Sequence, residues 1–156
     1  MVEEPNLEDV FPGLRGQPYQ IKSERDRRYN CIAFAARDKR NWWWPDLAEQ
    51  DTWPAAVARV ETVEAFRDAF ATLGYVVCDH DQLEAAYEKV ALFALAGKPK
   101  HAARQLPSGR WTSKLGPMED IQHALHDLTG MVYGSVVLVM KRPLPTGGEK
   151  AEGEGG

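Results

Sequence analysis

Residues 89–116, KVALFALAGKPKHAARQLPSGRWTSKLG, determine most of the predicted architecture. The run VALFAL at 90–95 is continuously apolar and has the length of a buried strand. A turn, AGKPK, separates it from HAARQL at 101–106, and the glycine-containing turn PSGR leads into WTSKLG at 111–116. Apolar runs joined by such short turns are typical of β-hairpins. The segment therefore predicts three consecutive antiparallel strands.

Two helices are predicted on the N-terminal side of these strands. Asn30 is a suitable N-cap for CIAFAAR at 31–37, and Thr62 for VEAFRDAFATLG at 63–74, where the apolar residues recur at helical spacing. A proline-rich loop containing WWWPD and DTWP connects them. The combination predicts an α+β fold in which N-terminal helices pack on a mostly antiparallel β-sheet.

The remaining segments set the domain boundaries. Residues 117–128 are predicted to form either a short helix or an ordered loop, and the apolar run VYGSVVLVMKR predicts a long central strand. We expect one domain over 19–143, preceded by an extended arm at 1–18 that is rich in proline, glycine and acidic residues. The glycine-rich end at 144–156 is expected to be a disordered tail.

Composition limits the classes of function. The 156 residues suit a single domain, and an apolar share of 44% is enough for a core. The net charge of −4 and the acidic residues within the basic runs at 22–28 and 37–40 argue against a nucleic-acid partner. No run approaches the roughly 20 apolar residues that span a membrane, and no signal peptide is evident. We expect a cytoplasmic location, with export by a route without a cleaved signal remaining open.

The two cysteines, Cys31 and Cys78, are too few for a disulfide framework and are expected to be free thiols. Cys31 begins the predicted helix, where unpaired N–H groups favour thiolate and can hold an oxyanion. It is therefore a candidate nucleophile, and the alternative is a small buried residue of a core helix. Cys78 ends the short apolar run YVVC and is expected to be structural.

Histidine supplies the candidate base. His101 begins a predicted strand, from which a neutral imidazole can accept a thiol proton and return it to a leaving group. The alternative is a surface histidine beside Lys98 and Lys100. His123 and His126 are three residues apart, which would suit a shared helical face, but no third metal ligand is evident. No metal and no cofactor is predicted.

The run YNCIAFAA at 29–36 resembles the nucleophile segment of papain-like bacterial hydrolases of the NlpC and CHAP type. Residues 89–116 resemble their second half, in which a strand is followed by a histidine-bearing strand, a hairpin and a third strand. The chain also resembles an uncharacterised bacterial family with NCIAW-like, WWWP-like and HAARxLxxGxWxSKLG-like blocks. The resemblance, from about Tyr19 to Arg142, implies a papain-like core and a cysteine acyl-enzyme acting on amides or thioesters.

This resemblance assigns Cys31 as the nucleophile and His101 as the general base. Two residues are candidates for orienting the imidazole. The PSGR turn should bring the His101 region beside Ser113, whose hydroxyl can accept a hydrogen bond, and beside Lys114, which cannot accept. His123 is the second candidate for this role.

Substrate-binding residues are predicted around the cysteine. Asn30 either only caps the helix or also directs its amide to an oxyanion hole. Trp42, Trp43 and Trp44 form either the aromatic rim of a substrate groove or, together with Trp53, a lid that completes a small core. Three consecutive side chains cannot all point inward, so at least one is expected to be exposed or to lie at the mouth of a cleft.

Two functions follow from these patterns. The first is a cysteine hydrolase or acyltransferase acting on a peptide-like or other amide substrate, which predicts faster alkylation of Cys31 than of Cys78 at neutral pH. The second is a non-catalytic binding, immunity or adaptor module on the same fold, which would contact a protein partner through the tryptophan loop and the acidic arm.

Overall fold

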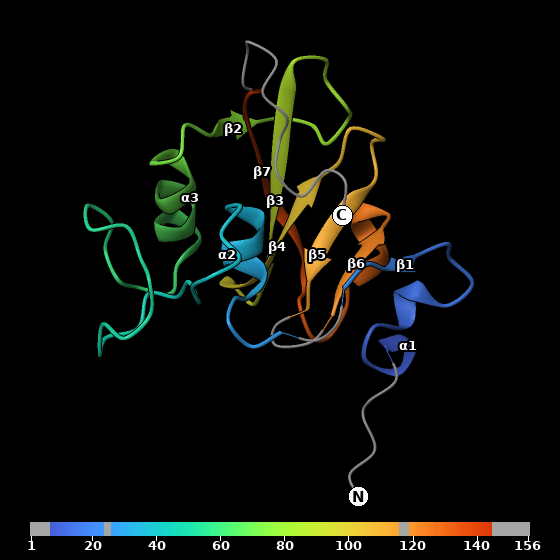
Figure 1. Cartoon of the computed structure of the whole chain (residues 1–156), viewed down its shortest axis with the longest axis horizontal. Helices are drawn as coiled ribbons and strands as arrows, with labels where there is room; N and C mark the ends of the chain where they lie inside the picture. Colours follow the sequence, from blue (N-terminus) through green and yellow to red (C-terminus); the bar gives the residue numbers. More distant parts are fainter. Residues whose placement is uncertain (1–6, 24–25, 116–118, 145–156) are drawn as a thin grey trace, which may run out of the picture.

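The computed structural model describes residues 7–23, 26–115 and 119–144. Its strands are β1 (Gln20–Ile21), β2 (Val76–Cys78), β3 (Tyr87–Leu95), β4 (Lys98–Gln105), β5 (Trp111–Lys114), β6 (Asp120–His123) and β7 (Ser135–Pro143). Its helices are α1 (Leu7–Val10), α2 (Cys31–Ala35) and α3 (Val63–Ala71), with 3-10 turns η1 (Pro12–Leu14) and η2 (Leu125–Leu128). In this part of the chain the strands form one sheet in the order β1-β6-β5-β4-β3-β7-β2 (Figure 1). The predicted α+β class with a mostly antiparallel sheet is confirmed.

The centre of the sheet is the predicted three-strand segment. Ala96 and Gly97 both have positive φ, 51° and 80°, which gives the two-residue turn that matches the twist of a hairpin. Strand β3 therefore pairs antiparallel with β4, and Phe93 lies opposite His101, with a register shift immediately beyond. Strand β4 pairs with β5 only at Arg104 and Gln105, so the residues around His101 lie beyond that ladder.

One strand differs from the helix or loop expected for residues 117–128. Asp120–His123 forms β6, which pairs with β5 on one side and with the two-residue strand β1 on the other. The helical turn η2 follows it. The run is short and of mixed polarity, and it becomes a strand because β5 offers it an unpaired edge. Residues 116–118 lie outside the described residues.

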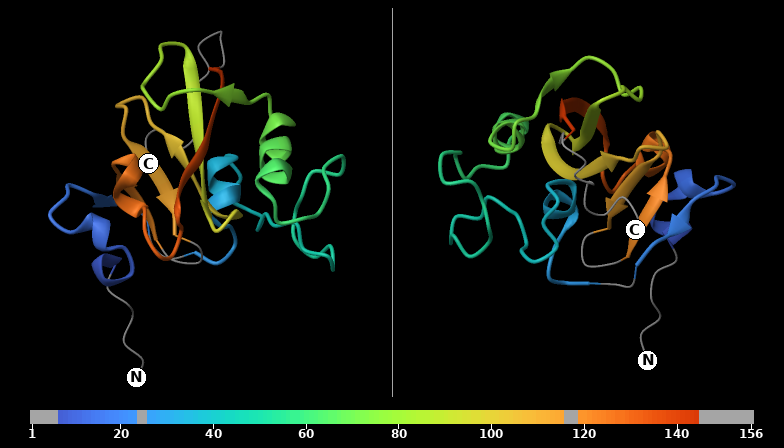
Figure 2. Two further views of the ribbon diagram at one scale, coloured as in Figure 1. Left: turned by 180° about the vertical axis from the view of Figure 1, so that it is seen from behind. Right: turned by 45° about the horizontal axis from the view of Figure 1, so that its top comes forward.

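Successive side chains of the central strands enter two separate cores. Leu92 and Ala102 pack with α2 and α3 on one face of the sheet. Phe93 and Ala103 pack with α1, η1 and η2 on the other face. This alternation is the two-residue period of an extended chain. Figure 2 shows α2 and α3 on one side of the sheet and α1 on the other.

Residues 7–14 differ from the extended arm that the sequence predicts. They form α1 and η1, and they bury Leu7, Phe11 and Leu14 in the second core. A side chain at Gly13 would place its Cβ 2.4 Å from the carbonyl oxygen of Asp127, so the glycine lets η1 approach η2. The predicted tail lies outside the described residues from position 145 onward. No helix in the described ranges is long and apolar enough to cross a bilayer.

The start of α3 is fixed by its predicted cap, since the Thr62 side chain accepts a hydrogen bond of 3.1 Å from the backbone N–H of Ala65. Replacing Thr62 by alanine leaves that N–H without its partner. We expect Thr62→Ala to lower the free energy of unfolding by about 1 kcal/mol in urea denaturation. Thr62→Asn, which keeps a capping oxygen, should stay close to the wild type. Equal losses in both variants would contradict a capping role.

Candidate active site

The short helix α2 is closed at both ends. At its N-terminus, Asn30 Oδ1 accepts from the N–H of Ala33 at 3.1 Å, which confirms the predicted cap. At its C-terminus, Arg37 has a φ of 67°, and the N–H groups of Arg37 and Asp38 donate to the carbonyls of Phe34 and Ala33. This left-handed turn satisfies carbonyls that would otherwise lack partners. The five helical residues are thereby capped at both ends where they pack against the sheet.

Asn30 also joins the helix start to the tryptophan loop. Its Oδ1 accepts from the backbone N–H of Trp43 at 3.1 Å, and its Nδ2 donates to the Trp43 carbonyl at 2.8 Å. The side chain is buried and engaged on both its oxygen and its nitrogen. In this structure Asn30 acts as a cap and a clamp. An oxyanion role for its amide stays a prediction.

The sulfur of Cys31 lies against the backbone of β4. Its Sγ is 3.9 Å from the carbonyl oxygen of Lys100, and the N–H groups of Ala102 and Ile32 act on it electrostatically. Lys100 and Ala102 are the residues on either side of His101 in the chain. The thiol is therefore held next to the strand position predicted for the general base.

Burial opposes ionisation of this thiol. It raises the pKa of Cys31 to about 11, although the N–H groups of Ala102 and Ile32 and the charge of Lys114 act in the other direction. The sequence predicts a lowered pKa from the helix N-terminus. A helix of five residues supplies too little field to offset the loss of water around the sulfur. The resting group is a neutral thiol.

We therefore expect iodoacetamide to alkylate Cys31 of the folded protein at about pH 8 roughly 100-fold more slowly than an exposed cysteine. A shift of the thiol pKa from 9.0 to about 11 lowers the thiolate fraction by about that factor. Peptide mass spectrometry over a pH series measures the rate, with urea-denatured protein as the reference. Equal rates in folded and denatured protein would contradict the burial. This expectation reverses the rapid labelling that the sequence suggests.

Three of the predicted catalytic residues form one buried hydrogen-bonded chain. His101 Nε2 lies 2.9 Å from Ser113 Oγ, and Ser113 Oγ lies 2.7 Å from His123 Nε2. His123 Nδ1 lies 2.7 Å from the carbonyl oxygen of Ala124. All three side chains are fully buried. Both candidates for the orienting role therefore belong to this chain, because Ser113 bridges the two imidazoles.

The direction of these hydrogen bonds follows from the carbonyl at the end of the chain. A carbonyl can only accept, so His123 carries its proton on Nδ1, and its Nε2 accepts from the Ser113 hydroxyl. The Ser113 oxygen then accepts from Nε2–H of His101. Burial lowers the pKa of His123 to about 4. Burial also lowers the pKa of His101 well below its ordinary value, and the neighbouring charge of a protonated His123 acts in the same direction. His101 is therefore neutral, with an unprotonated Nδ1.

That Nδ1 atom is buried and has no hydrogen-bond partner among the described residues. The ring around it packs against aromatic side chains. Its centroid is 5.3 Å from that of Phe93 and 4.0 Å from that of Tyr133. No hydrogen bond joins it to Cys31 within the described ranges, where the sulfur meets backbone atoms instead. The structure thus brings together His101, Ser113 and His123, and places Cys31 against the same strand.

The tryptophan loop packs mainly around one phenylalanine. Trp44 and Trp53 meet Phe66 edge-on, with ring centroids 5.3 Å and 5.0 Å away. The indole N–H of Trp43 donates to Asp38 at 2.8 Å. The three consecutive residues are partly buried: Trp42, Trp43 and Trp44. These contacts support the lid interpretation, while a role in binding substrate stays a prediction.

Two residues beside this site make contacts that the sequence did not predict. Lys114 Nζ donates to the carbonyls of Asp26 and Tyr29 and lies 4.8 Å from the Tyr29 ring centroid, so it fixes the segment that enters α2. Burial lowers the pKa of this lysine, while nearby acidic groups, Cys31 among them, oppose the shift. Tyr133 stacks on His101. Its only signal in the sequence is a tyrosine–glycine pair before the last strand.

The end of α2 is tied to the sheet by a buried ion network. Glu88 accepts from Arg37 at 2.6 Å, from Arg142, and from the Tyr75 hydroxyl at 3.3 Å. Burial alone would raise the pKa of Glu88, but the two guanidinium groups outweigh it and lower the pKa. A charged carboxylate therefore anchors the helix that carries Cys31.

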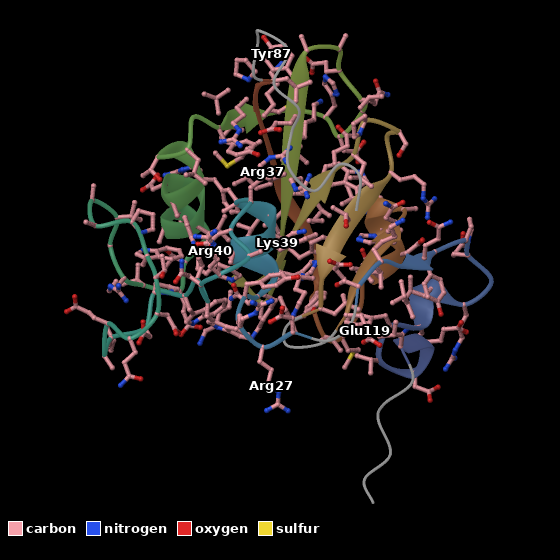
Figure 3. The ribbon with its side chains drawn as sticks, viewed as in Figure 1. Arg27, Arg37, Lys39, Arg40, Tyr87 and Glu119 are labelled. Carbon is pink, nitrogen blue, oxygen red and sulfur yellow. The ribbon has the colours of Figure 1, made fainter. Side chains whose placement is uncertain are left out.

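Two basic residues that follow α2 in the chain, Lys39 and Arg40, face solvent. Figure 3 shows Arg37, Lys39 and Arg40 around this helix, and Arg27 pointing away from the molecule. Lys39 and Arg40 are exposed, and the Lys39 ammonium lies 5.7 Å from the centroid of the Phe34 ring. These two side chains are solvated, whereas Arg37 of the same basic run belongs to the buried Glu88 network.

A group of possible metal ligands lies at the end of β2. Donor atoms of Cys78, Asp79 and His80 lie within 4.8 Å of one another. The buried ammonium of Lys89 already contacts this group, 3.3 Å from His80 Nδ1 and 3.1 Å from a carboxylate oxygen of Glu84. A lysine cation in that position competes with a metal ion. Cys78 itself is buried and donates to the His80 carbonyl at 3.2 Å.

Comparison with known families adds one finding. A family model described as a domain of unknown function, DUF7689, matches residues 20–141. The chain belongs to the DUF7689 family. The matched DUF7689 segment contains the candidate site residues: Cys31, His101, Ser113 and His123. Neither the curated proteins nor the solved structures contain a significant match to the chain.

Proposed function

We propose that this DUF7689 protein is a cysteine hydrolase or acyltransferase that acts on an amide or thioester bond. Cys31 is the nucleophile, and Nδ1 of His101 is the general base. The finer fold assignment, a papain-like (NlpC-type) core, belongs to this proposal. It is supported by a cysteine at the start of a helix that packs on the sheet and a histidine on a following strand. A cytoplasmic location stays a prediction.

One observation carries the proposal. The chain from Ala124 through His123 and Ser113 engages Nε2 of His101 and leaves Nδ1 as a buried lone pair. An unsatisfied acceptor in a core costs free energy unless a ligand or a reaction uses it. The Cys31 thiol lies against the backbone on both sides of His101, and in this proposal it supplies the proton.

The reaction balances with these two groups. The thiol proton moves from Cys31 to Nδ1 of His101 as Sγ bonds to the substrate carbonyl carbon. The leaving amine or thiol then takes that proton as its bond to carbon breaks. Water or another acceptor attacks the acyl-cysteine in the second half and returns the thiol. Ser113 and His123 orient the imidazole and keep Nε2 protonated throughout.

The second candidate function is a binding, immunity or adaptor module on the same fold. The covered Cys31 sulfur supports it, because a pKa of about 11 leaves a protonated thiol at rest. In this case Cys31 and the histidine chain are elements of the core, and a protein partner contacts another surface. Burial of a polar hydrogen-bonded network is consistent with such a structural role.

Acyl transfer from p-nitrophenyl acetate distinguishes the two functions. In a Cys78→Ser background, we expect intact mass spectrometry to show one acetyl group on Cys31, with catalytic release of p-nitrophenol. Cys31→Ser should abolish both signals. His101→Gln should slow acylation by about 100-fold or more, the usual contribution of a general base. His126→Gln is the matched control, because that side chain is 67% exposed and outside the chain of hydrogen bonds.

Turnover that survives in Cys31→Ser, or acetylation spread over surface groups, would exclude the proposed nucleophile. The binding function would then be favoured. Circular dichroism of each variant checks that the loss of activity is not a loss of folding.

A further inference from the structure

Tyr133 makes the closest ring contact with the proposed general base. Its ring lies parallel to the His101 imidazole, with 4.0 Å between centroids and 9° between planes. Phe93 meets the same imidazole edge-on at 5.3 Å. Phe93 comes from the neighbouring strand, whereas Tyr133 comes from the loop before β7. The face of the imidazole is thus held by a residue outside the β-sheet.

The loop that carries Tyr133 is closed by its two glycines. Gly130 and Gly134 exchange backbone hydrogen bonds of 2.9 Å and 2.8 Å. The two residues at the tip, Met131 and Val132, are exposed to 92% and 42%. The tip therefore faces solvent, while the following tyrosine turns inward onto the histidine.

Gly134 allows this arrangement. It has a φ of 75°, and a Cβ at this position would lie 1.9 Å from the carbonyl oxygen of Ala94. Only glycine fits so close to β3 in this backbone conformation. The loop consequently docks on the strand next to His101, at a fixed distance from it.

We propose that Tyr133 is a positioning residue, which fixes the plane of the His101 imidazole so that Nε2 stays on Ser113 and Nδ1 stays available for the thiol proton. The inference rests on the proposed function. The single hydrogen bond from Nε2 to Ser113 fixes one atom of the ring but leaves rotation about that contact. A parallel stack removes this freedom, because tilting the ring loses the aromatic contact.

The position of Tyr133 relative to the nucleophile supports the same role. Burial raises the pKa of the Tyr133 hydroxyl well above its ordinary value, and the charge of an ionised Cys31 would raise it further. The tyrosine is therefore neutral and lies within electrostatic reach of the sulfur. It covers one face of the imidazole without adding a charge.

Imidazole 15N spectra test this role directly. In the wild type we expect a single His101 tautomer with protonated Nε2 and unprotonated Nδ1. Tyr133→Phe, which keeps the ring, should preserve it. Tyr133→Leu should mix the two tautomers and accelerate solvent exchange of the Nε2 proton by about 2- to 10-fold, as expected for the loss of one aromatic stack. Val132→Ala, one residue away at the exposed tip, is the matched control.

If thermal melting shows that Tyr133→Leu is unfolded, Tyr133→Met replaces it, because methionine fills the space with a flexible side chain. Wild-type spectra in the folded leucine or methionine variant would overturn the positioning role, as would equal changes in Val132→Ala. Acyl transfer measured on the same samples separates the two hypotheses. Altered spectra in the leucine variant, without acyl transfer in the wild type, would overturn the proposed catalysis and leave a purely structural contact.

Discussion

Acidification from about pH 7 to about pH 4 is expected to remove about 3 kcal/mol of the free energy of unfolding through His123 alone. The unfolded chain binds a proton at this histidine near the ordinary value of 6.5, whereas burial lowers the pKa in the folded protein to about 4. Between these values the unfolded state holds more protons, so stability falls as the pH falls. His101 adds to the loss in the same direction.

Urea denaturation at a series of pH values measures this loss. Above about pH 4.5 this window separates the histidines from the carboxylates with lowered pKa values. The ordinary pKa is 4.5 for Glu84 and Glu88 and 3.8 for Asp26, and their contributions are lost only below these values. His123→Gln should flatten the dependence between about pH 6.5 and pH 4.5. His126→Gln should not, since its side chain is 67% exposed. A wild-type slope in His123→Gln would show that this imidazole is protonated in the folded protein.

Glu88→Gln is expected to lower the free energy of unfolding by about 3 kcal/mol and the melting temperature by about 10 °C. The substitution keeps the shape of the side chain but removes the charge that two guanidinium groups share. Arg37 and Arg142 are 14% and 23% exposed in their side chains, so neither can recover full hydration in place. Differential scanning calorimetry measures the change.

Glu61→Gln is the matched control for this prediction. Glu61 is exposed and precedes α3, outside the Glu88 network. The melting temperature of the Glu61→Gln variant should therefore lie within a degree or two of that of the wild type. Similar melting temperatures for both variants and the wild type would mean that the Glu88 network contributes no net stability. Because Arg37 ends α2, loss of the network should also loosen the helix that carries Cys31 and speed its alkylation.

Locally encoded parts of the fold were predictable from the sequence. The strands of residues 90–114 follow from an apolar run and turn residues that need no distant partner, and α3 follows from its spacing and its threonine cap. Strands β1 and β6 are different. Both are short and mixed in polarity, and they exist because they pair with each other and with β5. Pattern reasoning has no access to such pairing.

The candidate site likewise contains residues that local sequence predicts and residues that only long-range pairing or docking brings in. The hairpin register brings Ser113 to His101, as the sequence predicts, but His123 joins them only through β6. Tyr133 arrives from a loop whose docking on β3 depends on Gly134. For the Cys31 thiol, two effects on the pKa compete: the N–H groups at the helix start lower it, and burial raises it more. The sequence predicts the helix start, whereas the full burial of the thiol depends on how the folded chain packs around it.

The place of β7 in the strand order affects how the chain folds during synthesis. Strand β7 lies between β3 and the edge strand β2, and Tyr87 pairs with Pro143, so this side of the sheet is completed only when residues 135–143 are available. Until then the ribosome-bound chain carries β3 with one edge open, and the apolar face for α2 and α3 is incomplete. Pairings between segments so distant in sequence form slowly. A nascent chain arrested before residue 135 should therefore bind chaperones and be cleaved readily by proteases. Once β7 has left the ribosome, chaperone binding and protease sensitivity should both be lost at the same chain length.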